Sequence, residues 1–94
     1  MTGYFYILRC AENTLYCGST KDLILRFEQH KQGFGANFTR KYEPICIAYY
    51  EVYPRIDLAF YREKQVQKWS RAKKEALIAS KIIDLKELAL KKFK

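Results

Sequence analysis

The sequence contains only one histidine and three cysteines, and this scarcity excludes several kinds of site. His30 alone cannot build a histidine-rich metal centre. Cys10, Cys17 and Cys46 are odd in number and show no Cys-x-x-Cys spacing, so they predict neither a disulfide framework nor a zinc cluster. Reduced thiols in the cytoplasm fit this pattern. Any metal ion would therefore be held by carboxylate oxygens and water.

Long apolar runs are also lacking. No stretch approaches the roughly 18 apolar residues of a membrane-spanning helix. The first residues, Met1-Thr2-Gly3-Tyr4, lack the basic and then apolar segments of an export signal. The chain has 94 residues and no repeat or Pro/Ser-rich linker, which predicts one domain. We expect a cytoplasmic monomer that does not associate with membranes.

Acidic residues are few. The chain has 10 Asp and Glu and 18 Lys and Arg, so its formal charge is +8. This imbalance favours a polyanionic partner, with DNA as the first candidate. Basic charge can also serve solubility alone, so that alternative stays open at this point. The basic residues are densest in the last third, at Arg62, Lys64, Lys68, Arg71, Lys73 and Lys74.

The hydrophobic patterning predicts an α+β fold. Two aromatic-rich segments, 3–9 and 14–18, flank a polar tripeptide and predict a β-hairpin, and residues 45–53, after Pro44, predict a third strand buried on at least one face. Helices are predicted at about 21–32, at 57–69 with Asp57 as its cap, after Ser70, and at 84–93, while 33–41 reads as a loop. The stripe predicted to be buried on the second helix is Leu58, Phe60 or Tyr61, Val66 and Trp69. A small antiparallel sheet covered by helices would bury these stripes.

A set of polar side chains occurs in an order that suits phosphodiester hydrolysis, which needs an activated water and a cation to stabilise charge on the phosphate. The set is Tyr6, Tyr16, Arg26, His30 and Glu63. Arg26 and His30 lie one helical turn apart on one face, and the Arg guanidinium suits a phosphate. An exposed polar helix face explains this pair equally simply, and Glu63 among basic neighbours is compatible with a surface ion pair.

These residues resemble the motifs of the GIY-YIG endonuclease superfamily, in particular its small stand-alone bacterial members and the nuclease domain of an excision-repair subunit. Tyr4-Phe5-Tyr6 keeps the tyrosine of the first motif, and Tyr16-Cys17-Gly18 keeps the tyrosine and glycine of the second. The ordered remainder runs from Gly18 through Arg26, His30 and the glycine loop to Glu63. The resemblance extends from about residue 4 to 78. It implies a three-stranded antiparallel sheet flanked by helices, with the nuclease-like domain at 1–80 and a C-terminal amphipathic helix at 81–94 packed on it.

The resemblance also implies roles for individual residues. Glu63 would be the single protein ligand of one Mg²⁺ or Mn²⁺ ion, held weakly without substrate. Arg26 would stabilise charge in the transition state, and His30 would contact phosphate or transfer a proton. One of Tyr6 and Tyr16 would help to deprotonate the attacking water while the other orients it. A tyrosine acting as a base at neutral pH needs cationic neighbours that lower its pKa.

Residues around this set are assigned supporting roles. Gly18 would permit close approach of backbone or substrate next to Tyr16. Thr39 and Arg40 resemble a recurrent pair beyond the loop and would contact the substrate. Ser19 stands where some members of the superfamily carry a lysine, which leaves more of the charge stabilisation to Arg26.

The resulting hypothesis is a divalent-metal-dependent endonuclease that hydrolyses DNA phosphodiester bonds in repair or recombination, with a protein partner supplying specificity where one is needed. A basic nucleic-acid-binding module with little or no catalysis is the second hypothesis. Its phosphate contacts would be Lys64, Lys68, Arg71, Lys73 and Lys74. A third hypothesis is an interaction domain that another protein recruits through the C-terminal helix.

Overall fold

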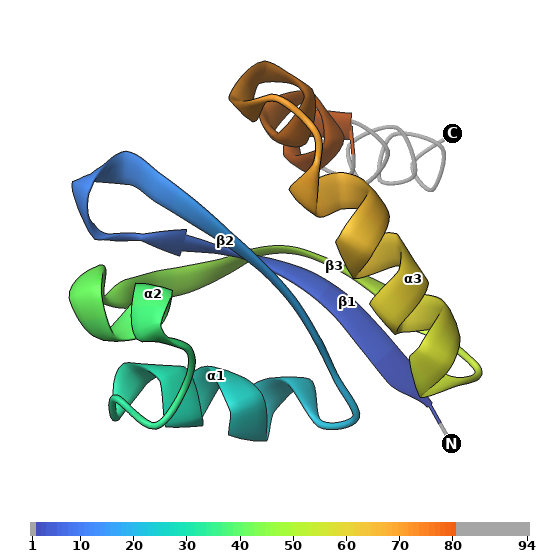
Figure 1. Cartoon of the computed structure of the whole chain (residues 1–94), viewed down its shortest axis with the longest axis horizontal. Helices are drawn as coiled ribbons and strands as arrows, with labels where there is room; N and C mark the ends of the chain where they lie inside the picture. The colour runs from blue at the N-terminus through green and yellow to red at the C-terminus, as the bar shows by residue number, and fades with distance from the viewer. Residues whose placement is uncertain (1, 81–94) are drawn as a thin grey trace, which may run out of the picture.

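The computed structural model describes residues 2–80 and contains a three-stranded antiparallel sheet with helices on both faces (Figure 1). The strands are β1 (Gly3–Cys10), β2 (Thr14–Thr20) and β3 (Pro44–Tyr53), in the order β2-β1-β3. A short 3-10 turn, η1 (Ala11–Asn13), joins β1 to β2, and the predicted hairpin is confirmed. The predicted α+β class and the three-stranded sheet are also confirmed.

The helices are α1 (Leu23–Lys31), α2 (Asn37–Lys41) and α3 (Ile56–Gln67), and residues 71–80 are helical as well. Asp22 begins α1 because its carboxylate accepts the backbone N–H of Leu25 at 3.1 Å. Ser70 caps the following helix in the same way, accepting the N–H of Lys73 at 3.3 Å. The predicted loop at 33–41 is wrong in part, since α2 lies within it, and Arg55 rather than Asp57 occupies the cap position of α3.

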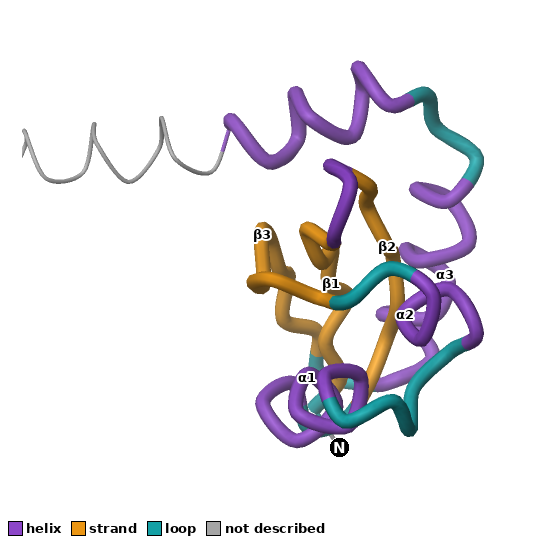
Figure 2. Tube along the Cα trace, turned by 90° about the vertical axis from the view of Figure 1, so that its left-hand side faces the viewer, coloured by secondary structure: helices purple, strands orange, loops and turns teal. Residues whose placement is uncertain are grey.

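The central strand β1 is buried on both faces. Phe5 and Ile7 point to the side covered by α3, while Tyr6, Leu8 and Cys10 point to the side covered by α1 and α2. Figure 2 shows the strands between α1 and α3. Alternating side chains of one strand thus form two small cores, and the second core contains the first of the predicted catalytic tyrosines.

The packing predictions are confirmed in part: Val66 is buried on α3 and Tyr49 on one face of β3, but other residues predicted to be buried are exposed. On α3 the buried side chains are Ala59 and Val66, whereas Leu58, Phe60 and Tyr61 are 39%, 48% and 71% exposed. Strand β3 is less covered than its apolar sequence predicts, with exposed side chains at Ile45, Cys46, Tyr50 and Val52. The physical reason is that β3 is an edge strand. Periodicity tells which residues share a face but not whether another element covers that face.

A polar network joins α3 to β3. The guanidinium of Arg62 donates to both oxygens of Glu51, at 3.0 and 3.2 Å, and the hydroxyls of Tyr49 and Tyr53 each donate to the same carboxylate at 2.6 Å. These hydrogen bonds hold the pKa of Glu51 below its usual value against the opposing effect of burial. Glu51 therefore fixes the position of α3, and with it the position of Glu63.

The part of the chain that the structure describes contains no helix long and apolar enough to cross a bilayer. The predicted helix at 84–93, and with it the segment 81–94 assigned to the C-terminal helix, lies outside the described residues.

Candidate active site

Three aromatic rings meet on the side of the sheet that α1 and α2 cover. Tyr6 comes from β1, Tyr16 from β2 and His30 from α1. The ring centroids of Tyr6 and Tyr16 are 6.4 Å apart, and that of His30 lies 6.0 Å from the first and 5.1 Å from the second. The structure therefore brings together three of the five predicted catalytic side chains in one cluster.

Gly18 makes room for this cluster. It lies directly opposite Tyr6 in the β1–β2 pairing. A Cβ atom at this position would overlap the ring and hydroxyl of Tyr6, which occupies the space that a side chain would need. The close approach predicted at Gly18 is present, but the group that approaches is the Tyr6 phenol rather than substrate or backbone.

His30 is buried, with 1% of its surface exposed, and is hydrogen-bonded on both ring nitrogens. Its Nε2 lies 2.9 Å from the hydroxyl of Tyr6, and its Nδ1 lies 2.7 Å from Oγ1 of Thr39. Gly35 packs so closely against the imidazole that a Cβ atom there would overlap Nδ1. The alternative of an exposed polar face is therefore wrong for His30, and so is the prediction that it contacts phosphate directly, because the ring is enclosed.

The directions of these hydrogen bonds follow from the number of protons that each side chain can donate. The single hydroxyl proton of Thr39 is donated to the carbonyl of Ala36, at 3.0 Å, so Oγ1 accepts from the Nδ1–H of His30. In the neutral ring Nε2 is then an acceptor, and it accepts the hydroxyl proton of Tyr6. Thr39, which is 2% exposed, positions His30 and does not reach a nucleic acid. The predicted substrate contact at Thr39 is wrong for this reason.

Burial is the largest cause of the pKa shifts of His30, Tyr6 and Tyr16. It lowers the pKa of His30 to about 4, with the charge of Arg26 acting in the same direction, so the ring is neutral at physiological pH. It also raises the pKa of Tyr6, and Tyr16 nearby adds to this, although a hydrogen bond and the charge from Arg26 oppose it. Burial likewise raises the pKa of Tyr16. Arg26 does lower the pKa of Tyr6 and of Tyr16, as a tyrosine base would need, but desolvation outweighs it.

Arg26, a residue of α1, lies beside Tyr6 of β1 and Tyr16 of β2. The charge of its guanidinium acts on the Tyr6 hydroxyl, and its Nη1 donates to Oε1 of Gln29 at 3.2 Å. The side chain is partly buried, in contrast to a fully solvated arginine. The guanidinium has five N–H donors, so donors remain for an anion.

Glu63 approaches the same region from α3, on the other side of edge strand β2. Its Oε1 accepts the hydroxyl proton of Ser19 at 2.7 Å, and its Oε2 accepts from Nε2 of Gln67 at 2.9 Å. The negative charge of Glu63 acts on both Tyr6 and Tyr16, raising their pKa values. Figure 1 shows β2 running between α1 and α3. The five predicted catalytic residues thus surround the edge of the sheet at Gly18.

Three positioning residues were missed from sequence: Ser19, Gln67 and Gly35. Gln67 follows Glu63 by four residues on a helix, a spacing that signals a side-chain contact. Ser19 carried a weaker signal, as a departure from the superfamily pattern next to Gly18. Nothing in the sequence marked Gly35, because its role depends on a ring placed against it by the fold.

The donor set of Glu63 fits a hard divalent cation as one ligand among several. The side chain is 13% exposed, and each carboxylate oxygen keeps a lone pair beyond the hydrogen bond it already accepts. Within residues 2–80 no group of three or more His, Cys, Asp or Glu side chains could hold a metal ion. A cation at Glu63 would therefore need oxygens from water and phosphate.

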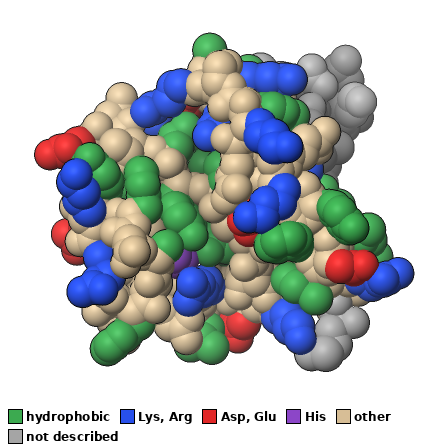
Figure 3. Space-filling view, viewed as in Figure 1, with side chains coloured by type: hydrophobic (Ala, Val, Ile, Leu, Met, Phe, Trp, Pro, Cys, Tyr) green, Lys and Arg blue, Asp and Glu red, His purple; other side chains and the backbone are tan. Residues whose placement is uncertain are grey.

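Basic side chains surround the site on the face shown in Figure 3, where Lys and Arg lie over both the α1 side and the α3 side. Arg40, Lys64, Lys68 and Lys73 are exposed, as phosphate contacts require, and Lys74 is half-buried. Arg71 is exposed as well, but its guanidinium donates to the backbone carbonyl of Asn13 and to Glu75, 3.1 Å away. Arg71 thus ties the helix at 71–80 to the β1–β2 turn, and its predicted role in nucleic-acid binding stays a prediction together with those of the five others.

Comparison with known proteins agrees with this geometry. The GIY-YIG catalytic domain matches residues 2–76. A UPF0213 protein of Pediococcus pentosaceus is 39% identical over 85 residues, which cover 90% of each chain, and one of Natronomonas pharaonis is 40% identical over 76 residues, 81% of this chain and 89% of its own. The solution NMR structure of the UPF0213 protein of Bacillus halodurans superposes with a TM-score of 0.56 at 36% identity, covering 86% of each chain. The chain therefore belongs to the GIY-YIG nuclease superfamily, among the small UPF0213 proteins.

Proposed function

We propose that this protein is a divalent-metal-dependent endonuclease that hydrolyses phosphodiester bonds in DNA. The observation that carries the proposal is the meeting of Tyr6, Tyr16 and Arg26 with Glu63 across the edge of β2. Membership of a nuclease superfamily and the net charge of +8 support the same conclusion. The resemblance to a repair nuclease supports a role in DNA repair or recombination.

Glu63 would hold Mg²⁺ or Mn²⁺ together with water and substrate oxygens. When bound, such an ion supplies charge stabilisation to the phosphate and lowers the pKa of a bound water. Ser19 and Gln67 orient the Glu63 carboxylate, since each donates to a different oxygen. These hydrogen bonds fix the orientation of the Glu63 carboxylate before substrate binds, which reduces the entropy cost of forming the site.

Tyr6 and His30 together orient a hydroxyl for contact with the attacking water. The raised pKa of Tyr6 argues against a tyrosinate formed in advance. A phenol that donates its proton to a neutral imidazole keeps a lone pair on its oxygen, which can accept a hydrogen bond from the attacking water, and the proton of this water passes to solvent. The water oxygen then forms a bond to phosphorus, and the bond from phosphorus to the leaving oxygen breaks. The leaving oxygen takes its proton from solvent.

Arg26 and Tyr16 complete the proposed set. The Arg26 guanidinium beside Tyr6 has donors left for the phosphate, whose charge grows in the transition state. Tyr16, less buried than Tyr6, orients the attacking water. In this arrangement His30 and Thr39 are positioning residues, because they act through the hydroxyl of Tyr6.

The test is nicking of supercoiled DNA at low salt with Mg²⁺ or Mn²⁺. We expect Glu63→Gln and Arg26→Ala each to lower the cleavage rate by about 10²-fold or more, the usual effect of removing one charge-stabilising group. Glu28→Gln is the matched control, since Glu28 is an exposed glutamate of α1 outside the site. Tyr6→Phe and Tyr16→Phe test the two hydroxyls separately.

Cleavage by the wild type and the control, lost in the site variants, would establish the activity and its residues. If Glu63→Gln cleaves at the wild-type rate, the metal assignment is wrong. Retention of DNA in a gel shift without cleavage by any protein would instead favour the second hypothesis, a basic nucleic-acid-binding module. In that case Glu63→Gln would bind slightly more tightly, because it only removes negative charge.

A further inference from the structure

A cavity of about 630 Å³ lies beside the candidate active site, between α1 and strand β3. We call it the tyrosine cavity, and its lining residues are Tyr4, Lys21, Asp22, Leu23, Ile24, Ile47 and Tyr50. Its volume falls within the roughly 300–1,000 Å³ that is usual for small-molecule sites. None of its residues belongs to the predicted catalytic set.

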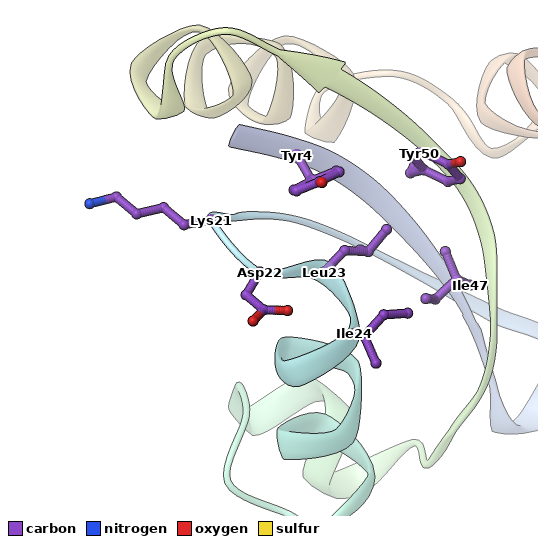
Figure 4. Close-up of a pocket in the computed structure, with 7 residues that line it drawn as sticks. All are labelled: Tyr4, Lys21, Asp22, Leu23, Ile24, Ile47 and Tyr50. Carbon is purple, nitrogen blue, oxygen red and sulfur yellow. The ribbon is translucent and has the colours of Figure 1, made fainter. Parts of the chain in front are cut away.

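The walls of the tyrosine cavity are aromatic and apolar. Figure 4 shows Tyr4 from β1, Leu23 and Ile24 from α1, and Ile47 from β3 around one space, with Lys21 extending outward. The rings of Tyr4 and Tyr50 have centroids 6.4 Å apart and are tilted by 57°. Ile24 and Tyr50 remain 66% and 41% exposed, an unusual amount for large side chains facing a cavity. This part of the protein therefore presents an uncovered apolar surface.

The charge at the mouth favours a ligand attached to phosphate. Lys21 is exposed and extends away from the cavity, where its ammonium is placed to pair with a phosphate next to a bound base. The carboxylate of Asp22 already accepts the N–H of Leu25 and caps α1, so it serves the helix. Aromatic walls with a lysine at the entrance suit a planar base joined to a phosphate, because bases stack on aromatic rings and Lys pairs with the backbone.

The tyrosine cavity shares the lining residue Lys21 with a neighbouring cavity. The same lysine lines a second cavity of about 440 Å³ that also includes Ser19, Thr20 and Phe60. Ser19, which lines this second cavity, donates to the proposed metal ligand Glu63. Tyr4 precedes Tyr6 by two residues on β1 and lies on the same face of the sheet. A strand with one phosphate at Glu63 would thus pass Lys21 before it reaches the cavity.

We propose that the tyrosine cavity binds one unpaired nucleobase of the strand that is held at Glu63. This inference rests on the proposed function and names its substrate class, a nucleic-acid strand with unpaired bases. In an intact duplex the bases are stacked inside, and drawing one out costs about a few kcal/mol. A protein that reads one base in this cavity therefore discriminates against fully paired DNA.

The test measures binding without cleavage, using Glu63→Gln protein in EDTA and fluorescence anisotropy. Two labelled single strands are compared, each about 12 nucleotides long, which is within the site sizes of single-strand-binding folds. One strand carries bases and the other is an abasic chain with the same number of phosphates. We expect the strand with bases to bind roughly 5- to 100-fold more tightly, the range that base stacking on aromatic side chains supplies. A duplex of the same length should bind more weakly than the strand with bases.

Tyr50→Leu should remove most of the difference between the two strands, whereas Tyr50→Phe should keep it, because the ring remains. Tyr61→Leu is the matched control, since Tyr61 is an exposed tyrosine of α3 outside the cavity. Ile24→Ser serves as a second variant, at a 66% exposed position where a polar residue leaves the fold intact. Equal affinity of the wild type for both strands would overturn the proposal. So would a dimer that Ile24→Ser dissociates, because the cavity would then be an interface between copies.

Binding and cleavage fail separately in this design. A base-dependent affinity that depends on Tyr50, combined with no nicking of any DNA, would refute the proposed endonuclease while leaving the tyrosine cavity established. Nicking that depends on Glu63, combined with equal binding of the strand with bases and the abasic strand, would support the endonuclease and refute base binding in the tyrosine cavity.

Discussion

Nε2 of His30 lies 2.9 Å from the hydroxyl of Tyr6, although 24 residues separate the two in the chain. The imidazole is held on its other side by Thr39, whose own proton is donated to the carbonyl of Ala36. This chain of donors selects one tautomer of His30 and one orientation of the Tyr6 hydroxyl. The protein thus fixes the direction in which the Tyr6 hydroxyl donates its proton, and the first two predictions examine this relationship.

Replacing Thr39 with valine removes the acceptor of the His30 Nδ1–H while keeping the shape of the side chain. We expect a loss of about 1–3 kcal/mol in the free energy of unfolding, because a buried donor is left without a partner. The nicking rate should fall as well, since the tautomer is no longer fixed. Urea denaturation and ¹⁵N chemical shifts of the imidazole measure the two effects. Thr39→Ser keeps the hydroxyl and should behave like the wild type; if it matches Thr39→Val, the hydrogen bond is not the cause.

The buried imidazole makes stability depend on pH. The pKa of His30 is about 4 in the folded protein and about 6.5 when unfolded, so the unfolded chain binds more protons between these values. Stability contributed by neutral His30 is complete above pH 6.5 and is lost as the pH falls towards 4, by up to about 3 kcal/mol.

Titration of the single imidazole by NMR reports the folded pKa directly, and denaturation at several pH values reports the stability. His30→Gln should remove this part of the pH dependence, while the contribution of the carboxylates remains. An imidazole that titrates near pH 6.5 in the folded protein would contradict the enclosed, neutral ring.

Alanine at Gly18 should strain the cluster, since its Cβ would overlap the buried ring of Tyr6. We expect a loss of about 1–3 kcal/mol in the free energy of unfolding, as for other overpacked cores, and reduced cleavage as Tyr6 shifts. Gly33→Ala is an instructive control. Gly33 has open space around it but a φ of 84°, so alanine there should cost about 1 kcal/mol through backbone strain and leave cleavage unchanged. Equal nicking by Gly18→Ala and wild type would show that Tyr6 need not hold its place.

Ser19 and Gln67 should affect the apparent affinity of the site for Mg²⁺, because both donate to the carboxylate of Glu63. Ser19→Ala and Gln67→Met each free one carboxylate oxygen from its donor. We expect the Mg²⁺ concentration for half-maximal nicking to rise by about 10-fold or more, while the rate at saturating metal changes less. A purely structural role would lower stability and the saturated rate together. Gln32→Met, at an exposed glutamine beyond α1, controls for loss of an amide.

Local patterns predicted much of the framework. The hairpin, the third strand, helix α1 to within two residues and the Ser70 cap all follow from strand propensity, apolar spacing and short polar side chains next to the backbone they bind. Helix α2 was missed because it spans only five residues inside a segment with two glycines. In such a short segment, tertiary packing of Phe38 and Tyr42 against the core outweighs local propensity.

The order of Tyr6, Tyr16, Arg26, His30 and Glu63 is a property of the sequence, and so is membership of the superfamily. The sequence by itself also determined the excess of positive charge and the alternation that divides β1 between two cores. Only the tertiary structure decided that His30 and Thr39 are enclosed, that Glu51 holds α3 in place, and that Ser19 reaches Glu63 across 44 residues of chain. The physical reason is that propensity and periodicity act between near neighbours. Burial, the pKa shifts that follow from it, and hydrogen bonds across the sheet arise only when distant segments pack together.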